Sequence, residues 1–359
     1  MARTTEEVLG GYVITGCGIV NRANFMFSLD PDDEVEPWKT MIAKGELEPV
    51  KARIATHNIV RGSWGWVDAK QYHNGVIAGG IGDHGSIQGV MANHLNGVIV
   101  FNYENGANGG EPTLSRDIAS GVFSLRYIGD SYYGCGNERT LVRRLPDGRW
   151  EGLNRVEDGG RYNDLDGFSE TEIYVVGNED AFSMWDGERL ISIDPGFEGG
   201  PWSKVFHADS VCCGGDGRVY VSGSNAELIA GRHGDGWETL IPQRKSNLGT
   251  LRSLAWYDGT LYGVSDKQMF VYDPDGARWK VKLWNDENSP ASFGFMSVKD
   301  GIMLVAGPFG ANWFDGTAWH RIWGEIGGLD IVRMELTKQQ VDAAEKGYNS
   351  VDELIDRER

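Results

Sequence analysis

The segment YVSGSNAELIAGRHGDGW, residues 220 to 237, contains two markers that recur along the chain and decide the fold. The first marker is a short apolar run that ends in a small residue, YVSG in this segment. The second is an Asp-Gly pair followed by Trp, GDGW in this segment. The last residue of the first marker recurs at intervals of 41, 46, 42 and 42 residues, at Gly136, Gly177, Gly223, Ser265 and Gly307.

The second marker keeps nearly the same period. Its aspartates are separated by 39, 49, 40 and 40 residues, at Asp147, Asp186, Asp235, Asp275 and Asp315. Asp-Gly tolerates the positive φ angles of a tight hairpin turn, and Trp offers a large apolar surface for packing between sheets. Other turn signals, such as Asp258-Gly259, precede it in each unit. Each unit is therefore predicted to be a four-stranded antiparallel meander.

Such a unit cannot bury both of its faces alone, so the units must stack around an axis. Five units are predicted at residues 118–155, 160–194, 206–242, 250–285 and 292–325, and a sixth, with an insertion, at 60–107. A seventh is predicted from residues 10–43 together with LDIVRMEL, residues 329–336, a strand that would close the ring and remove its open edges. Residues 1–336 would form one domain. Two capping-box patterns in residues 337–359 predict a short helical tail.

In period and turn chemistry the chain resembles the β-propeller superfamily, with repeats of WD40-like, Kelch-like or YVTN-like size. The resemblance covers residues 10–336 and implies an all-β, seven-bladed propeller of four-stranded blades, closed by the C-terminal strand. The Gly-His and Trp-Asp dipeptides of WD40 repeats are not in register here. The sialidase box also differs, because Asp and Gly are adjacent in this chain. The resemblance is one of architecture and identifies no narrower family.

The charge of the chain limits its partners. With 52 acidic and 34 basic residues, the net charge is −18. Such a surface repels phosphate, which disfavours nucleic acid and anionic membranes as partners, and it would attract a basic protein. The first residues, MARTTEEVLGG, contain no hydrophobic stretch, so no signal peptide is expected and the predicted location is the cytoplasm. The four cysteines, Cys17, Cys135, Cys212 and Cys213, are predicted to be reduced thiols.

Long loops are the strongest functional signal in the sequence. Residues 43–62, 81–96, 107–120 and 194–206 are expected to gather at one end of the ring, with Asp-Gly turns at the other. Long loops on a rigid scaffold are where binding residues tend to lie. The predicted partner-binding residues are Trp64, His84, Glu111, Arg116 and Trp202.

Two further groups of polar residues are weaker candidates. Asp83, His84 and His94 have metal-binding side chains, but their spacing fixes no site, so neither a metal nor a cofactor is predicted. Aligned positions on the proposed inner strands hold Phe123, Asp164, Ser210, Arg252 and Gly294, and Asp164, Asp166 and Arg252 could converge near the axis. Basic residues that precede inner strands could bind an anion or an acidic partner segment, or could pair with surface carboxylates: Arg61, Arg116, Arg161, His207 and Arg252.

These observations favour a non-enzymatic, cytosolic binding propeller that recognises a macromolecule through its long loops. A specific version is an inhibitor or immunity protein of a bacterial toxin. Two alternatives stay open. One is a hydrolase, lyase or lactonase that acts on a sugar or another small molecule, although no Ser-His-Asp order, phosphate loop or His-Glu motif is found. The other is a sugar-binding lectin, with Trp202 and Trp64 as platforms.

Overall fold

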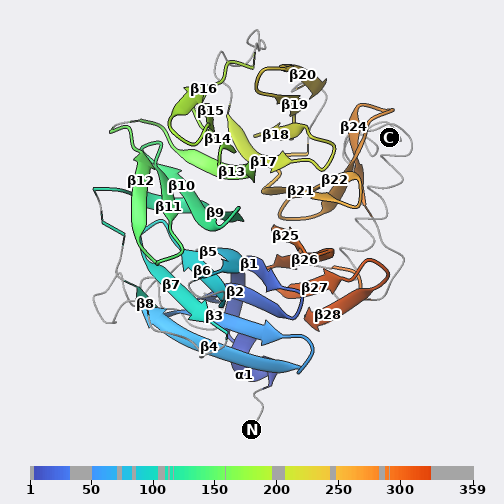
Figure 1. Cartoon of the computed structure of the whole chain (residues 1–359). Coiled ribbons are helices and arrows are strands. Elements are labelled where there is room, and N and C mark those ends of the chain that lie inside the picture. Colours follow the sequence, from blue (N-terminus) through green and yellow to red (C-terminus); the bar gives the residue numbers. More distant parts are fainter. Residues whose placement is uncertain are drawn as a thin grey trace, which may run out of the picture.

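The computed structural model describes the chain in twelve ranges: residues 4–32, 51–70, 75–82, 86–103, 110–111, 114–115, 117–157, 159–195, 207–242, 248–282, 288–290 and 292–324. Within these ranges the chain forms seven four-stranded antiparallel sheets arranged as blades around an axis (Figure 1). The predicted all-β class and the predicted number of blades are confirmed.

The blades follow one another along the chain, each with its strands in sequence order. Blade 1 consists of β1 (Tyr12–Asn21), β2 (Asn24–Pro31), β3 (Lys51–Asn58) and β4 (Ser63–Lys70). Blade 2 consists of β5 (Val76–Ile81), β6 (Ile87–Ala92), β7 (Val98–Asn102) and β8 (Gly110–Glu111). Blade 3 consists of β9 (Ser120–Ile128), β10 (Ser131–Asn137), β11 (Leu141–Arg144) and β12 (Trp150–Asn154).

Blade 4 consists of β13 (Tyr162–Ser169), β14 (Glu172–Gly177), β15 (Phe182–Trp185) and β16 (Leu190–Ser192). Blade 5 consists of β17 (Ala208–Cys213), β18 (Val219–Gly223), β19 (Leu228–Arg232) and β20 (Gly236–Ile241). Blade 6 consists of β21 (Ser253–Tyr257), β22 (Thr260–Val264), β23 (Met269–Asp273) and β24 (Arg278–Val281). Blade 7 consists of β25 (Phe295–Lys299), β26 (Ile302–Gly307), β27 (Gly310–Phe314) and β28 (Trp319–Trp323).

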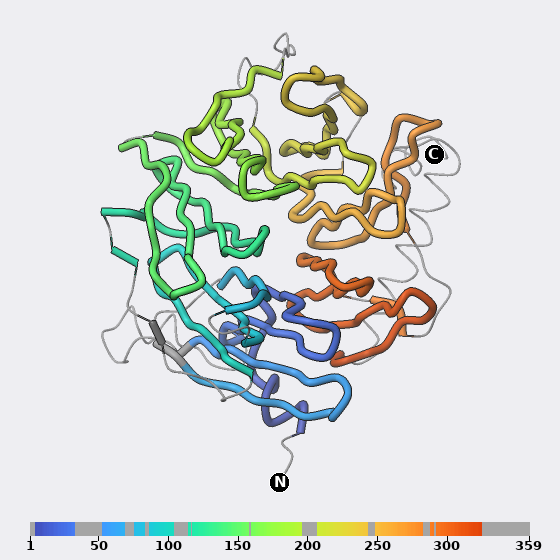
Figure 2. The backbone as a smooth tube through the Cα atoms, in the orientation of Figure 1, coloured from blue at the N-terminus to red at the C-terminus, as the bar shows by residue number. Residues whose placement is uncertain are grey.

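The first strand of every blade lies closest to the axis. Each of these inner strands contacts the inner strands of the two neighbouring blades, and β1 contacts both β5 and β25, so the ring is complete. The backbone trace shows this closure where the blue N-terminal blade meets the red blade 7 (Figure 2).

The turns have the chemistry that the repeats predicted. Asp258 and Gly259 both have positive φ, 45° and 74°, and they join β21 to β22 as a two-residue hairpin. The turns between third and fourth strands use aspartate differently. The side chain of Asp315 accepts hydrogen bonds from the backbone N–H groups of Thr317 and Ala318.

The tryptophan that follows the Asp-Gly pair packs between blades, as predicted. Trp237 on blade 5 makes edge contacts with Phe182 and Tyr174 on blade 4, at ring distances of 4.8 and 6.2 Å. The indole N–H of Trp279, on blade 6, donates to the carbonyl of Ala226 on blade 5 at 2.9 Å. Large outer side chains thereby fill the wedge between neighbouring sheets.

The first two blades divide differently from the prediction. Residues 12–21 form the inner strand of blade 1, whereas the prediction made YVITGCG its second strand, and 51–58 and 63–70 complete that blade. Blade 2 accordingly spans 76–111 rather than 60–107. The Asp-Gly signal fails here because the first turn uses Asn21, whose side chain accepts from the backbone N–H groups of Ala23 and Asn24. The predicted closing strand, 329–336, and the predicted helical tail, 337–359, lie outside the described residues.

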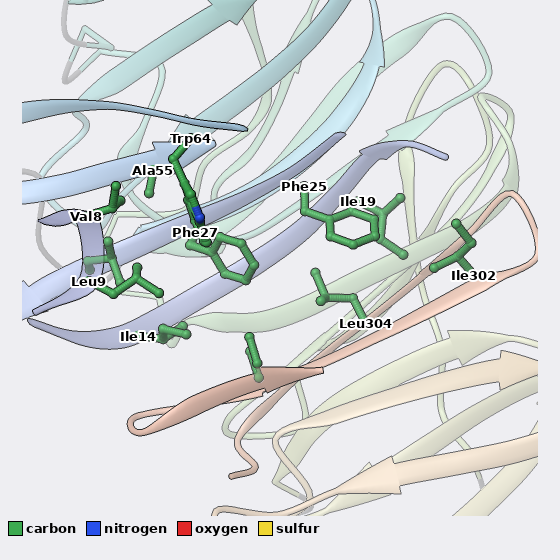
Figure 3. Close-up of a cluster of buried hydrophobic side chains, with 13 residues drawn as sticks. Val8, Leu9, Ile14, Ile19, Phe25, Phe27, Ala55, Trp64, Ile302 and Leu304 are labelled. Atoms are coloured by element: carbon green, nitrogen blue, oxygen red, sulfur yellow. The ribbon is translucent and has the colours of Figure 1, made fainter. Parts of the chain in front are cut away.

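The seam between blades 1 and 7 holds a large apolar cluster (Figure 3). It joins Phe25, Phe27 and their neighbours on blade 1 to Ile302 and Leu304 on blade 7. The helix α1 (Thr5–Leu9) adds Val8 and Leu9, both buried, to this cluster. Thr4 and Glu7 cap the helix reciprocally, Thr4 N donating to Glu7 Oε2 at 2.7 Å and Glu7 N to Thr4 Oγ1 at 3.2 Å. The Thr4-x-x-Glu7 pattern is a capping box, a helix signal that the sequence reasoning missed.

Polar contacts support the same seam. The N–H of Ile19 on β1 donates to Ser297 Oγ on β25 at 3.2 Å. Lys299 extends from blade 7 past blade 1, and its Nζ donates to the carbonyl of Gly79 on blade 2 at 2.6 Å.

Two smaller predictions can also be compared with the described residues. The four cysteines are free thiols, as predicted. Within the described ranges no helix is long and apolar enough to cross a membrane.

Candidate functional site

The strand order gives the ring two distinct faces. Connections between second and third strands, and between successive blades, lie at one end, called here the loop face. Connections from first to second and from third to fourth strands lie at the other end, called here the turn face. This follows from the antiparallel order shared by all seven blades.

Three of the four predicted loops contain strands, and residues 107–120 include the short β8 (110–111). Residues 43–62 include β3 (51–58), and residues 81–96 include β6 (87–92). The long connection of blade 1 is instead the segment between β2 and β3, and its residues 33–50 lie outside the described residues. The connection from β8 to β9 and the connection from β16 to β17 lead into inner strands and therefore start and end on the loop face.

The proposed metal ligands belong to two different connections of blade 2. Asp83 and His84 fall between Gly82 and Ser86, whose backbone bond, Gly82 N to Ser86 O at 2.8 Å, closes the β5–β6 turn on the turn face. Asp83 and His84 themselves lie outside the described residues. His94 follows β6 and lies on the loop face. Among the described residues, no three His, Cys, Asp or Glu side chains form a group that could hold a metal.

Trp64 is a core residue rather than an exposed anchor. It is 9% exposed, stacks on His57 with ring centroids 4.2 Å apart, and donates its indole N–H to Thr5 Oγ1 at 3.1 Å. It therefore cannot serve as a lectin platform. The sequence pattern placed Trp64 just beyond a loop, because no strand was predicted in residues 43–62.

The remaining predicted partner-binding residues are placed only by their positions in the sequence relative to the strands. Arg116 and Trp202 lie outside the described residues, in the segments that lead into β9 and β17. Glu111 ends β8. His84 lies outside the described residues, between β5 and β6.

Of the five predicted cations, three lie on the loop face, one lies on the turn face, and Arg116 is outside the described residues. Arg161, His207 and Arg252 precede β13, β17 and β21, and all three are exposed. They surround Asp209: burial raises the pKa of its carboxyl, while a hydrogen bond from Ser224 and the charges of these three residues lower it. Arg61 lies in the β3–β4 turn, on the turn face, where its N–H donates to Asn58 Oδ1 at 2.8 Å.

Two of these cations differ in their partners. Arg252 forms an ion pair with Asp266, from the neighbouring β22–β23 connection, so it does not converge with Asp164 and Asp166. The Arg161 guanidinium lies over the Phe123 ring, 5.4 Å from its centroid. His94 stacks on the same ring at 6.4 Å.

Apolar side chains are also exposed on this face. Leu95, next to His94, is 51% exposed, and Phe309, in the β26–β27 connection of blade 7, is 54% exposed. An arginine held against an aromatic ring is a combination of residue types that is enriched at binding hot spots. We refer to Arg161, Phe123, His94 and Leu95 as the Arg161 platform.

The aligned positions on the inner strands differ from the predicted set. Pairing with the second strands makes Ser124, Asp164, Ser210, Ser253 and Phe295 equivalent. Phe123, Arg252 and Gly294 are each one residue away from that position. The polar members reach toward the next blade: Ser210 Oγ donates to Leu251 O at 3.2 Å, and Ser253 Oγ donates to Met296 O at 3.3 Å. This ring of positions therefore ties blades together.

Hydrogen bonds between blades are most numerous at Asp164 and Asp166. Asp164 accepts hydrogen bonds from Ser124 Oγ at 2.6 Å and from Arg126 Nη2 at 3.1 Å, both on blade 3. Its other oxygen accepts from the N–H of Val211, on blade 5, at 3.1 Å. Asp166 Oδ2 accepts from the N–H of Cys213 at 2.7 Å. The sequence reasoning missed Arg126, which neutralises this pair.

These hydrogen bonds between the inner strands of neighbouring blades have a clear physical cause. An inner strand has no partner strand on its axial edge, so every second N–H there needs another acceptor. Alternate carboxylates on β13 supply acceptors for alternate N–H groups on β17. Burial raises the pKa of Asp166 to about 6, although Arg126 and the two backbone N–H donors, Cys213 and Gly167, oppose that rise. Such a pKa is common in catalytic acids, but both oxygens of Asp166 already accept backbone hydrogen bonds.

Comparison with known proteins supports the fold. No family model matches the sequence, and no curated protein matches it. Among solved structures, the WD40 β-propeller domain of Doa1 is similar with a TM-score of 0.55 and 10% identity, over 83% of this chain and 90% of that one. The RRP9 WD40 repeats give a TM-score of 0.54 and 10% identity, over 87% and 93% of the two chains. The chain has a β-propeller fold.

An enzyme with this fold is also similar. A streptogramin B lyase gives a TM-score of 0.53 and 9% identity, over 70% of this chain and 83% of that one. WD40 propellers and a lyase share the architecture with this chain at equally low identity, so the fold alone does not decide the function.

Proposed function

We propose that this chain is a non-enzymatic propeller whose loop face binds a protein partner. The observation that carries the proposal is the Arg161 platform, in which an exposed guanidinium is held over Phe123 beside the exposed Leu95. Arginine and aromatic side chains are enriched among interface hot spots. The turn face consists mostly of hairpins, and the cations that lie over aromatic rings there already have protein partners. Arg232, over Phe168, forms an ion pair with Glu172, and Lys299, over Tyr127, donates to the carbonyl of Gly79.

The finer version of the proposal concerns the partner and the location. A net charge of −18 would draw a basic protein toward the chain, with association slowing as salt screens the attraction. A cytoplasmic inhibitor or immunity protein of a bacterial toxin has these properties. It needs no chemistry of its own and must bind its target quickly.

Arg116 and Trp202 extend the proposed contact area. Both belong to connections that lead into inner strands from the loop face. We include them as partner-binding residues on that ground. Glu111, at the end of β8, belongs to the same end of blade 2.

An enzymatic function is the second candidate, favoured by the similarity to the lyase and by the raised pKa of Asp166. The hydrogen bonding of the two carboxylates near the axis argues against an enzymatic function. Asp164 and Asp166 accept hydrogen bonds from Val211 N and Cys213 N, which makes them structural acceptors between blades 4 and 5.

Affinity measurements with the purified partner test the proposal. The partner is captured from the native host with the full chain, purified, and titrated against variants. Arg161→Ala and Trp202→Ala should each weaken binding by about 1 to 4 kcal/mol. Val60→Ala changes a 79% exposed residue of the β3–β4 turn and should leave the affinity unchanged.

The reverse pattern would contradict the proposal: full affinity in both loop-face variants and a loss with Val60→Ala. For the toxin version, co-expression of the chain should restore growth of cells that carry the toxic partner, and Arg161→Ala should reduce that protection.

A further inference from the structure

Arg161 is a cation without an ion-pair partner among the described residues of an acidic protein. Its side chain is exposed, and it makes no ion pair with any residue in the described ranges. Other arginines on the loop face have protein partners: Arg155 pairs with Glu138 at 2.6 Å, Arg252 pairs with Asp266, and Arg139 donates to the backbone carbonyl of Glu179 at 3.2 Å. The chain has 52 acidic and 34 basic residues, so an exposed guanidinium with no ion pair among the described residues is available to a ligand.

The guanidinium is also fixed in place. It lies on the face of Phe123, which is itself stacked with His94. Stacking on an aromatic ring leaves the N–H groups at the rim of the guanidinium available as donors. Holding the side chain in advance reduces the entropy that binding would otherwise cost.

Acidic groups flank the cation without pairing to it. The carboxylate of Glu179 lies near Gly160, the residue before Arg161, and its side chain is exposed. Asp209 lies within electrostatic reach of Arg161, yet its carboxyl bonds to Ser224 instead. A ligand that binds here must therefore pair with the positive charge of Arg161 while it approaches the negative charges of Glu179 and Asp209.

We infer that Arg161 receives the carboxylate of a Glu or Asp side chain of the partner, and that basic residues flank this acid in the partner. The inference rests on the proposed function and adds the chemistry of the contact. A carboxylate matches the two parallel N–H donors of a guanidinium. A phosphate group, with close to two negative charges, would be repelled more strongly than a carboxylate by Glu179 and Asp209. Flanking Lys or Arg side chains of the partner would pair with Glu179.

Three short peptides test the inference by NMR, using the arginine Nε–Hε signals of the full chain. The first is an acetylated, amidated pentapeptide with Glu between two Lys residues. The second has Gln in place of Glu, and the third has phosphoserine there. The Arg161 signal is assigned by its absence in Arg161→Lys.

The Glu peptide should shift the Arg161 signal in a saturable way, and the Gln peptide should bind at least tenfold more weakly. Arg161→Lys should lose most of the affinity for the Glu peptide. Arg155→Ala, which removes a paired arginine of the same face, should retain that affinity. A stronger response to the phosphoserine peptide would overturn the inference in favour of a phosphate site. Equal responses to the Glu and Gln peptides, or no response, would also overturn it.

This result can be separated from the proposed function. If the partner binds the loop face and Arg161→Ala leaves its affinity unchanged, the carboxylate contact is wrong while the binding function stands. If the Glu peptide binds at Arg161 and no protein partner occupies the loop face, the contact stands while the proposed function is wrong.

Discussion

The carboxylate of Asp166 accepts a hydrogen bond from the backbone N–H of Cys213, 2.7 Å away on the neighbouring blade. Cys213 belongs to an inner strand whose axial edge has no strand partner, so a side chain supplies the missing acceptor. Asp164 does the same for Val211, two residues earlier. The contact between blades 4 and 5 therefore depends on charged groups near the axis as well as on apolar packing.

The raised pKa of Asp166 predicts a pH-dependent stability. Because burial raises this pKa from 3.8 to about 6, the folded state holds the proton more tightly than the unfolded chain. The contribution of Asp166 is then fully present below about pH 4 and is lost as pH rises through about 6. Asp166→Asn removes the titrating carboxyl, so the variant should not lose stability in this way as the pH rises. The difference in unfolding free energy between variant and wild type should change by about 3 kcal/mol between pH 4 and pH 7 in urea titrations. A difference that is constant with pH would contradict this account of Asp166.

Arg126 should be important for the same contact. Arg126→Met removes the cation that donates to Asp164 at 3.1 Å and should cost about 1 to 3 kcal/mol in unfolding free energy, since a hydrogen bond to a charged group is lost. It should also raise the pKa of Asp166, moving the pH transition upward. Arg149→Met is the control, because Arg149 is 75% exposed in its ion pair with Asp147 and such surface pairs contribute little. Equal effects of the two substitutions would contradict the assigned role.

The helix α1 should stabilise the ring at its seam. Leu9 is 1% exposed in the cluster that joins blades 1 and 7, so Leu9→Ala should lower the unfolding free energy by about 2 to 5 kcal/mol. Glu6→Ala, on the exposed side of the same helix, should change it by less than about 0.5 kcal/mol. Thermal unfolding of both variants measures this. If Leu9→Ala melts like the wild type, the helix is not part of the seam.

Divalent metal ions should not stabilise the protein. Among the described residues, no three His, Cys, Asp or Glu side chains form a group that could hold a metal. A metal at a hundredfold excess over its Kd would add about 2.7 kcal/mol. The melting temperature should therefore be the same with chelator, Ca²⁺ and Zn²⁺. A reproducible rise of several degrees with either ion would revive the enzymatic alternative.

Repeated turn chemistry made most of the fold predictable. Asp258, Gly259 and Gly316 have positive φ angles that few residues adopt easily, and the Asp315 side chain caps its own turn, so Asp-Gly pairs mark hairpins in the sequence itself. Blade 1 has no such pair. Its first hairpin depends on the Asn21 side chain, and its second and third strands are separated by a long connection, which disguised the period.

The candidate site was less predictable because side-chain register depends on single residues. Counting a fixed distance back from the small-residue marker assumes equal turns, but blade 4 has an irregularity between Gly167 and Ser169 and blade 5 has a turn closed by Gly214 N and Arg218 O. Each adds one residue. The count therefore selected Phe123 and Arg252 in place of Ser124 and Ser253.

Site-specific photo-crosslinking tests the central claim, that the loop face binds the partner. A photoreactive amino acid is placed at Leu95, 51% exposed on the loop face, and separately at Val60, 79% exposed on the turn face. Each protein is irradiated in the native host, and adducts are identified by mass spectrometry. The account predicts a single protein adduct at position 95 that Arg161→Ala weakens, and no corresponding adduct at position 60. An adduct at position 60 with none at position 95 would contradict it.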